Sequence, residues 1–190
     1  MKITENDLRI LIREVLAFSV KGKVMRKNPT FWGTAGAGIL FVCEEDNTVF
    51  LMHRSRDVEQ PGTWGIPGGS VKGEGFYDSG MSAERPTDAT FWKGAKKETK
   101  EECGDLPNMS KSDIIGYIDF VSGSFIYRNF IVSLSLEEKL EWTSTIELNW
   151  ENDTYEWISF DDVDSYNLHF GVVYVLDNDT NFQDASQLDI

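Results

Sequence analysis

Cysteine and histidine are scarce in this chain of 190 residues, which contains two of each. The cysteines, Cys43 and Cys103, form neither a CxxC pair nor part of a Cys/His cluster. A disulfide framework and a structural zinc site are therefore poorly supported, and reduced thiols are expected. The histidines, His53 and His169, are too scattered to propose as a catalytic base, so we expect each to be structural.

Long apolar runs and basic residues are also in short supply. No stretch approaches the roughly 18 consecutive apolar residues that a membrane-spanning helix needs, and the N-terminus lacks the layout of a signal peptide. We therefore expect a cytoplasmic protein that does not contact membranes. With 18 basic and 32 acidic residues, the net charge of −14 repels polyanions, so we expect no extended nucleic acid as a partner. A small phosphorylated ligand is still compatible with this charge if a metal ion neutralises it locally.

The hydrophobic fraction of 41% is enough for one domain with a buried core. We predict an N-terminal helix and connector over residues 1–28, with the helix at 4–18. The main domain is predicted over residues 29–178. An acidic tail, which we expect to be mobile, follows over residues 179–190.

Hydrophobic patterning predicts the elements of the main domain. Strand-like patterns occur at residues 33–43, 48–53, 114–121, 125–134 and 155–160. The first two form a predicted hairpin. The best-marked helix runs from residue 87 or 88 to residue 103, with Gly104 as its C-terminal cap, and a short helix is predicted at 170–176. Strands split by one strongly marked helix, with further helices at both ends, predict a mixed sheet covered on both faces, which is an α/β fold.

Residues 60–69 contain four glycines and two prolines. Such a density of backbone-permissive residues predicts a tightly shaped loop, in which the main chain can approach a ligand closely.

Three glutamates in the predicted helix, Glu98, Glu101 and Glu102, are spaced at i, i+3 and i+4 and share one face. Such a row is destabilising unless it is solvated, paired with neighbouring lysines or occupied by cations. Magnesium suits the last case, because it prefers oxygen ligands and is commonly bound by one or two carboxylates plus substrate phosphates. A solvated helix face is the commoner explanation of such a row in isolation, but the glycine-rich loop upstream favours a cation site.

The loop and the helix together resemble the signature of the Nudix hydrolase family, G-x5-E-x7-R-E-U-x-E-E-x-G-U, in which U is aliphatic. The matching residues are Gly68 and Glu74 for G-x5-E, and Glu98, Glu101, Glu102 and Gly104 for the glutamate core. The stretch at residues 61–69 is also similar to the family's lead-in. The likeness runs from about residue 34 to about residue 176.

The resemblance implies a Nudix-like α/β/α sandwich with a mixed sheet. It also implies a hydrolase that uses Mg²⁺ or Mn²⁺ and cleaves a diphosphate linkage in a nucleotide-like substrate. Candidate substrates are a nucleotide sugar, ADP-ribose, a dinucleotide and a modified nucleoside triphosphate. In this activity, a metal-activated water attacks one phosphorus atom of the diphosphate.

The site residues follow from the same likeness. The predicted metal ligands are Glu98, Glu101, Glu102 and a carbonyl of Gly69 or Gly68. The same three glutamates are the predicted catalytic residues, and Glu151 is either a further ligand or base, or a glutamate in a surface loop. Glu74 would support the loop. The predicted substrate contacts are Arg54, at the basic end of the second strand, and Phe76 and Tyr77, which could stack on a base, as could Phe31 or Trp32.

The chain departs from the family pattern in several places. Residues 75–96, 22 positions where the family has 7, separate Glu74 from Lys97, so 15 are extra. This insert either contacts substrate, forms a lid or is a tolerated surface insertion. Lys97 stands where the family has arginine, whose planar fork can orient a glutamate in a way that lysine cannot. Thr99 and Asp105 occupy the two aliphatic positions.

Two other functions compete with hydrolysis. A catalytically silent Nudix-like module that senses a nucleotide is consistent with the insert and with the lysine. An isopentenyl-diphosphate isomerase is a poor match, because its usual cysteine and further metal ligands cannot be placed. The oligomeric state is left open, with a homodimer as one alternative.

Overall fold

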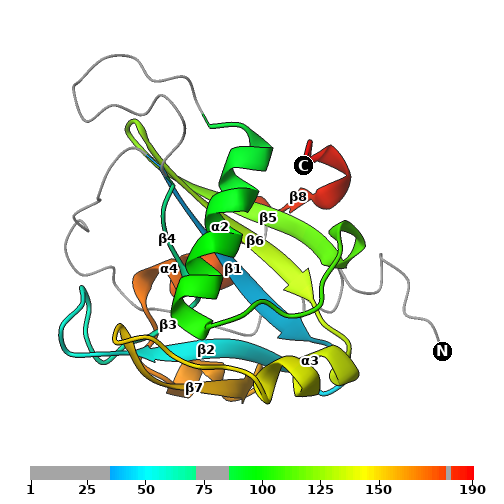
Figure 1. Ribbon diagram of the computed structural model, residues 1–190. Helices are drawn as coiled ribbons and strands as arrows, with labels where there is room; N and C mark the ends of the chain where they lie inside the picture. Colours follow the sequence, from blue (N-terminus) through cyan, green and yellow to red (C-terminus); the bar gives the residue numbers. More distant parts are fainter. Residues whose placement is uncertain (1–34, 72–85, 179–180) are drawn as a thin grey trace.

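The computed structural model describes residues 35–71, 86–178 and 181–190 (Figure 1). The helix predicted at residues 4–18 lies outside these ranges, as do Phe31, Trp32, Glu74, Phe76 and Tyr77. Within the described ranges, no helix is long and apolar enough to cross a membrane.

A single mixed sheet forms the centre of the molecule. Its longer strands are β1 (Ala35–Cys43), β2 (Thr48–Arg54), β5 (Ile114–Ser122), β6 (Phe125–Ser133) and β7 (Asn152–Ser159). Its short strands are β3 (Trp64–Gly65), β4 (Gly68–Ser70) and β8 (Gln183–Asp184). The strand order is β3-β2-β1-β6-β5-β8, with β4 paired to β1 and β7 paired to β2. The β1 and β6 strands run parallel, which makes the sheet mixed.

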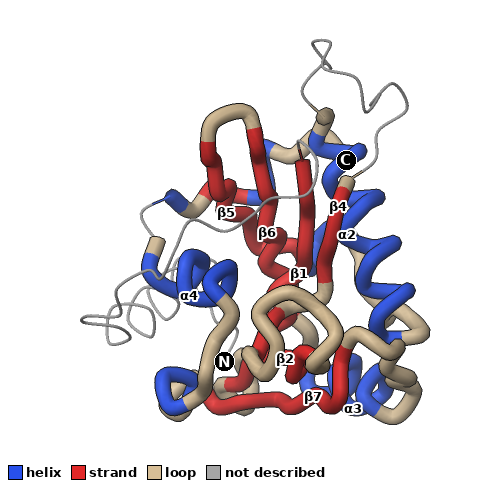
Figure 2. The backbone as a smooth tube through the Cα atoms, turned by 90° about the vertical axis from the view of Figure 1, so that its left-hand side faces the viewer, coloured by secondary structure: helices blue, strands red, loops and turns tan. Residues whose placement is uncertain are grey.

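Helices cover both faces of this sheet. The helix α2 (Asp88–Cys103) lies on one face and α4 (Phe170–Asp177) on the other, as the view in Figure 2 shows. The short helix α3 (Leu136–Thr143) packs on the α2 side through Trp142, which contacts Phe41 and Phe50. The predicted α/β/α sandwich is therefore confirmed.

The β1 strand explains why its sequence is apolar at every position. All nine of its residues are buried, because its alternating side chains enter two separate cores. Ala37, Ile39 and Phe41 face the core under α2, whereas Leu40 and Val42 face the core under α4. A strand buried on both faces shows a continuous apolar run in place of alternation.

Three features differ from the expectations. The segment expected to be a loop at residues 60–69 contains β3 and most of β4, because it pairs with β2 and β1. The α3 helix was not predicted, although Ser135 and Glu138 form a capping box at its start. The expectation of a mobile tail is wrong for residues 181–190, because β8 pairs with β5 and Leu188 is buried in the core. The segment boundaries at residues 28 and 178 stay predictions.

The capping box of α3 gives a test of this local structure. The Ser135 side chain accepts a hydrogen bond from Glu138 N, so Ser135→Ala should lower the free energy of unfolding by about 1 kcal/mol in urea denaturation. The control Ser144→Ala removes an exposed hydroxyl from the other end of α3 and should cost less. Equal losses in the two variants would contradict the capping role.

Candidate functional site

The α2 helix carries the glutamate row and has well-defined ends. Thr87 caps its first turn by accepting a hydrogen bond from Thr90 N, and Gly104 ends it with a φ of 82°, a conformation that favours glycine. Thr99, at a position where an aliphatic residue was expected, is fully buried, and its hydroxyl donates to Ala95 O. The helix therefore packs on the sheet despite this substitution.

Glu102 lies at the buried side of α2, with only 5% of its surface exposed. Gly68 N donates to Glu102 Oε1 over 3.3 Å, and Asn152 Nδ2 donates to Glu102 Oε2 over 3.5 Å. Burial, reinforced by the charges of Glu151 and Glu98, raises the pKa of Glu102 to about 8. A carboxyl group in such surroundings gains from any positive charge placed beside it.

Glu98 lies one turn earlier and presses against the glycine loop. Its side chain is 19% exposed. A Cβ atom added to Gly69 would lie 2.8 Å from Glu98 Cδ, so only glycine allows this approach. Burial raises the pKa of Glu98, and the charges of Glu101 and Glu151 act in the same direction. Glu98 and Glu102 therefore share one crowded, acidic corner.

Glu101 is held differently from the other two glutamates. Its side chain is 55% exposed, and Lys97 Nζ donates to its Oε2 over 2.6 Å. Lys97 Nζ also lies 3.5 Å from Glu98 Oε1, so this lysine pairs with both neighbouring carboxylates. Across the described ranges, no group of three acidic, histidine or cysteine side chains is close enough to hold an ion. The structure thus brings Glu98 and Glu102 to the loop, but not Glu101.

The register of β4 distinguishes the two glycine carbonyls that the sequence left open. In the ladder between β1 and β4, Ala37 lies opposite Gly69. On either side of this pair, Ile39 N donates a hydrogen bond to Pro67 O and Val71 N donates one to Ala35 O. Since hydrogen-bonded pairs alternate along an antiparallel ladder, Gly69 bonds to β1 and Gly68 points away from it. Gly68 N indeed reaches Glu102, so the Gly68 carbonyl also lies on the edge of β4 next to the glutamates.

Glu151 lies beside this corner, at the start of β7. Its main-chain oxygen accepts a hydrogen bond from Ser55 N over 2.8 Å, which ties the turn to the end of β2. Its charge contributes to the raised pKa values of both Glu98 and Glu102. The glutamate is thus near the other acidic groups.

These residues match the requirements of a hard divalent cation. Two carboxylates with raised pKa values and a main-chain carbonyl outside the ladder are all oxygen donors, the type that Mg²⁺ and Mn²⁺ prefer. Repulsion between the carboxylates would be relieved by positive charge. The donor set is therefore compatible with the cofactor that the sequence implied.

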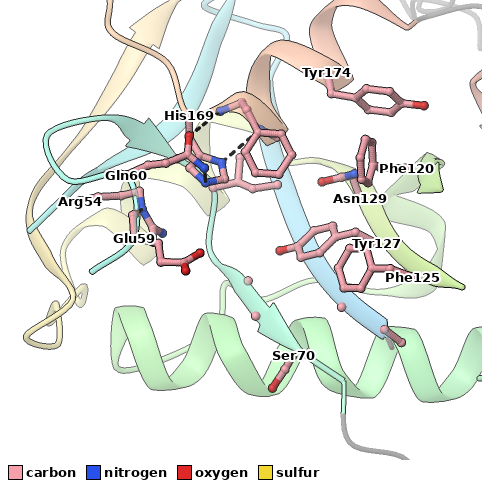
Figure 3. Close-up of a pocket in the computed structure, with 18 residues that line it drawn as sticks. Arg54, Glu59, Gln60, Ser70, Phe120, Phe125, Tyr127, Asn129, His169 and Tyr174 are labelled. Carbon is pink, nitrogen blue, oxygen red and sulfur yellow. Dashed lines mark hydrogen bonds between the residues drawn. The ribbon is translucent and has the colours of Figure 1, made fainter. Parts of the chain in front are cut away.

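A cavity of about 190 Å³ lies against the opposite side of the same glycine loop (Figure 3). Gly68 and Gly69 form part of its wall, so β4 separates the cavity from the glutamates. Arg54, predicted to contact substrate, lines the cavity, and its Nε donates to Glu59 O over 2.9 Å. In Figure 3, Arg54, Gln60 and His169 occupy one side and aromatic side chains the other.

The aromatic side of the cavity was not predicted. It is built by Phe120, Phe125, Tyr127, Phe170 and Tyr174. Burial raises the pKa of Tyr127 above its usual value, and the charges of Glu102 and Glu98 add to this effect. The cavity is therefore within electrostatic reach of the glutamates. The signal in the sequence was the alternation of residues 125, 127 and 129, which places their side chains on one face of a strand.

His169 has a structural role in the wall of this cavity. Its Nδ1 accepts a hydrogen bond from Gly171 N over 3.1 Å and thereby caps α4. Its Nε2 lies 3.0 Å from Nε2 of the Gln60 side-chain amide. Burial, assisted by the charge of Arg54, lowers the pKa of His169 to about 3.

Comparisons with known proteins identify a family and a fold. A family model described as NUDIX domain matches residues 33–176. The MutT protein from Methanosarcina mazei Go1 is 17% identical, with a TM-score of 0.52 over 80% of this chain and 96% of its own. RenU, a Nudix hydrolase from M. smegmatis, is 21% identical, with a TM-score of 0.49 over 77% of this chain and 83% of its own.

A third solved structure, an Ap4A hydrolase from C. elegans, is 17% identical, with a TM-score of 0.46 over 75% of this chain and 92% of its own. No curated protein sequence matches the chain. At such identities, the likeness to the first structure shows the fold alone, and the family match carries the relationship.

The two glycines of β4 should respond differently to alanine. A Cβ on Gly68 would lie 2.6 Å from Gly38 Cα and 2.7 Å from Ala37 O, and these main-chain atoms cannot move away. Gly68→Ala should therefore lower the free energy of unfolding by about 1–3 kcal/mol. Gly69→Ala should cost less, because it meets the flexible end of Glu98. Urea denaturation of both variants measures the difference, and the reverse order would refute the described packing.

His169 predicts a pH dependence of stability. Its pKa is about 3 in the fold and 6.5 in the unfolded chain, so between these values the unfolded chain binds more protons. The contribution of His169 to the free energy of unfolding should therefore fall as the pH is lowered from 6.5 towards 3, whereas Glu102, whose pKa is raised to about 8, contributes in the opposite direction. His169→Asn keeps a capping oxygen but cannot titrate there, so the difference in free energy of unfolding between the wild type and this variant isolates the histidine and should fall towards pH 3. Urea denaturation across the range provides the measurement, and parallel curves would exclude His169 as the cause.

Proposed function

This chain belongs to the Nudix hydrolase family, and we propose that it cleaves a diphosphate linkage between a nucleoside and a second group with a divalent metal ion. The proposal rests on one observation: Glu98 and Glu102 are packed against a glycine loop that also forms the wall of a cavity. The acidic groups could hold a cation, and the cavity on the other side of the loop could hold part of a phosphate-bearing ligand.

Glu98, Glu102 and the carbonyl of Gly68 would hold the ion. The ladder register supports Gly68 over Gly69 for this role, since Gly69 bonds to β1. A divalent ion bound there would lower the pKa of a water molecule and screen the charges of the diphosphate. Glu101 stays a predicted ligand, and its exposed side chain can turn towards the ion only if Lys97 releases it.

Other side chains would orient the substrate and the acidic groups. Arg54, at the cavity wall, carries a positive charge that could bind a phosphate oxygen. Lys97, which lies against both Glu98 and Glu101, would orient these two carboxylates until an ion draws Glu101 away from it. Glu151 is the proposed additional ligand or base, because its charge reaches both Glu98 and Glu102.

The cavity limits which part of a substrate it can enclose. Its volume of about 190 Å³ is below the roughly 300 Å³ that is typical for a drug-sized ligand. We infer that one ring system, and not a whole dinucleotide, would occupy it. Nucleotide sugars, ADP-ribose, dinucleotides and modified nucleoside triphosphates all satisfy this limit.

A second function is favoured by the contact between Lys97 and Glu101. If this ion pair persists, the ion would keep only two glutamate ligands on α2, and the protein would bind a nucleotide without turning it over. The same assay separates this sensor from the hydrolase, because the sensor would show binding and no product.

The metal-dependent reaction can be tested with a substrate panel. The protein is incubated with Mg²⁺ or Mn²⁺ and with nucleotide sugars, dinucleoside polyphosphates, oxidised nucleoside triphosphates or ADP-ribose, and phosphatase-sensitive products are measured. Glu102→Gln should lower turnover by at least about 100-fold, because even residues that only support metal ligands cost 10–100-fold when they are changed. Its fold should be retained, since the amide keeps the shape of the side chain.

The matched control is Glu141→Gln on the exposed surface of α3, which should leave turnover unchanged. Turnover by the wild type that does not depend on metal, or full activity of Glu102→Gln, would overturn the proposal. Binding without turnover in the wild type would favour the sensor.

A further inference from the structure

The aromatic side of the cavity contains one polar side chain without a partner. Asn129, on β6, is 2% exposed and lines the cavity. Among the described residues, none donates a hydrogen bond to its Oδ1 atom. A buried acceptor without a hydrogen bond lowers the stability of the fold, and such groups are rare in folded proteins.

The orientation of this amide is fixed by its neighbour on β5. Asn129 Nδ2 donates to Ile118 O over 3.2 Å. Since a carbonyl oxygen can only accept, the amide cannot be turned over without placing two oxygens against each other. Oδ1 is therefore the amide atom left without a partner among the described residues, and Figure 3 shows it directed towards the side on which His169 lies.

The surroundings of Oδ1 suit a flat ring. Phe120 and Tyr174 meet edge to face with their ring centres 4.9 Å apart, and Phe125 and Tyr127 form the adjacent wall. A Cβ on Gly36 would lie 2.7 Å from Tyr127 Cε2, so glycine is what allows this ring to lie against β1. Aromatic walls of this kind can stack on a nucleobase.

We propose that Asn129 reads the exocyclic amino group of a nucleobase bound in this cavity, and that the protein therefore prefers amino-bearing bases. The inference rests on the proposed function, because the base would belong to the nucleotide whose diphosphate is cleaved. The aromatic side chains bind the ring, and Oδ1 accepts the hydrogen bond from its amino group. A base without that group leaves the buried oxygen unsatisfied, which is the basis of the discrimination.

Three pairs of nucleoside 5′-monophosphates test this proposal by calorimetric titration. Each pair differs by one amino group: adenosine and purine riboside, guanosine and inosine, cytidine and 2-pyrimidinone riboside. In at least one pair, the amino compound should bind the wild type about tenfold more tightly, as expected for one buried hydrogen bond. Monophosphates contain no diphosphate linkage, so binding is measured without turnover.

Two variants test whether the preference for amino-bearing bases comes from Asn129 Oδ1. Asn129→Leu keeps the approximate size of the side chain, removes the acceptor and should bring the ratio within that pair close to one. The matched control Ser133→Ala alters another polar side chain of β6, which bonds to Glu44 away from the cavity, and should keep the ratio of the wild type. If the leucine variant does not fold, the titrations of the wild type still decide the question.

The proposal is overturned if all three ratios are close to one in the wild type, if no monophosphate binds, or if Asn129→Leu keeps the preference. These outcomes leave the metal-dependent hydrolysis untouched. Conversely, a protein that shows the amino preference but no turnover would refute the proposed function alone.

Discussion

The close approach of α2 to β4 is the contact on which the rest of the site depends. It brings Glu98 against Gly69, at a distance that a side chain on this glycine would prevent, and Glu102 against the N–H of Gly68. Burying two carboxylates this way is unfavourable, as their raised pKa values show. The fold tolerates the cost because α2 is capped at both ends and packed through a buried apolar face.

The same short strand is crowded on its other side. Gly36 and Gly38 on β1, together with Gly68, leave just enough room for the ring and hydroxyl of Tyr127. A strand with side chains at these positions would push β1, β4 and β6 apart. Small residues therefore set the thickness of the wall between the acidic groups and the cavity. Both the packing of the strands and the arrangement of the site require glycine at these positions.

Most of the fold was predictable, because it depends on patterns that act locally. The apolar run of β1, the ends of α2 and the strand-like patterns of β5 and β6 each leave a direct mark in the sequence. The α3 helix was overlooked because it is short and its signal is confined to Ser135 and Glu138. The tail was misjudged because its acidic composition hides the few residues, such as Leu188, that fill a gap in the core.

The site was predictable only in part. The spacing of the glutamates identified α2, but the pairing of Glu101 with Lys97 depends on rotamers, which a spacing rule does not contain. The choice between Gly68 and Gly69 required the ladder register, and the cavity required knowledge of how β5, β6 and α4 meet. Asn129 was not singled out, because β6 also carries Arg128 and Ser133, and only its contact with Ile118 reveals which of its atoms is free to accept.

The absence of side chains at two positions of β4 bears on how the two binding sites influence each other. One layer of main chain, without side chains at Gly68 and Gly69, is all that divides the cavity from the carboxylates. If a ligand on one side shifts this layer, atoms on the other side move with it, and the two binding equilibria are then coupled. A bound ion would then change the affinity of the protein for the ring by the same factor by which a bound ring changes its affinity for the ion.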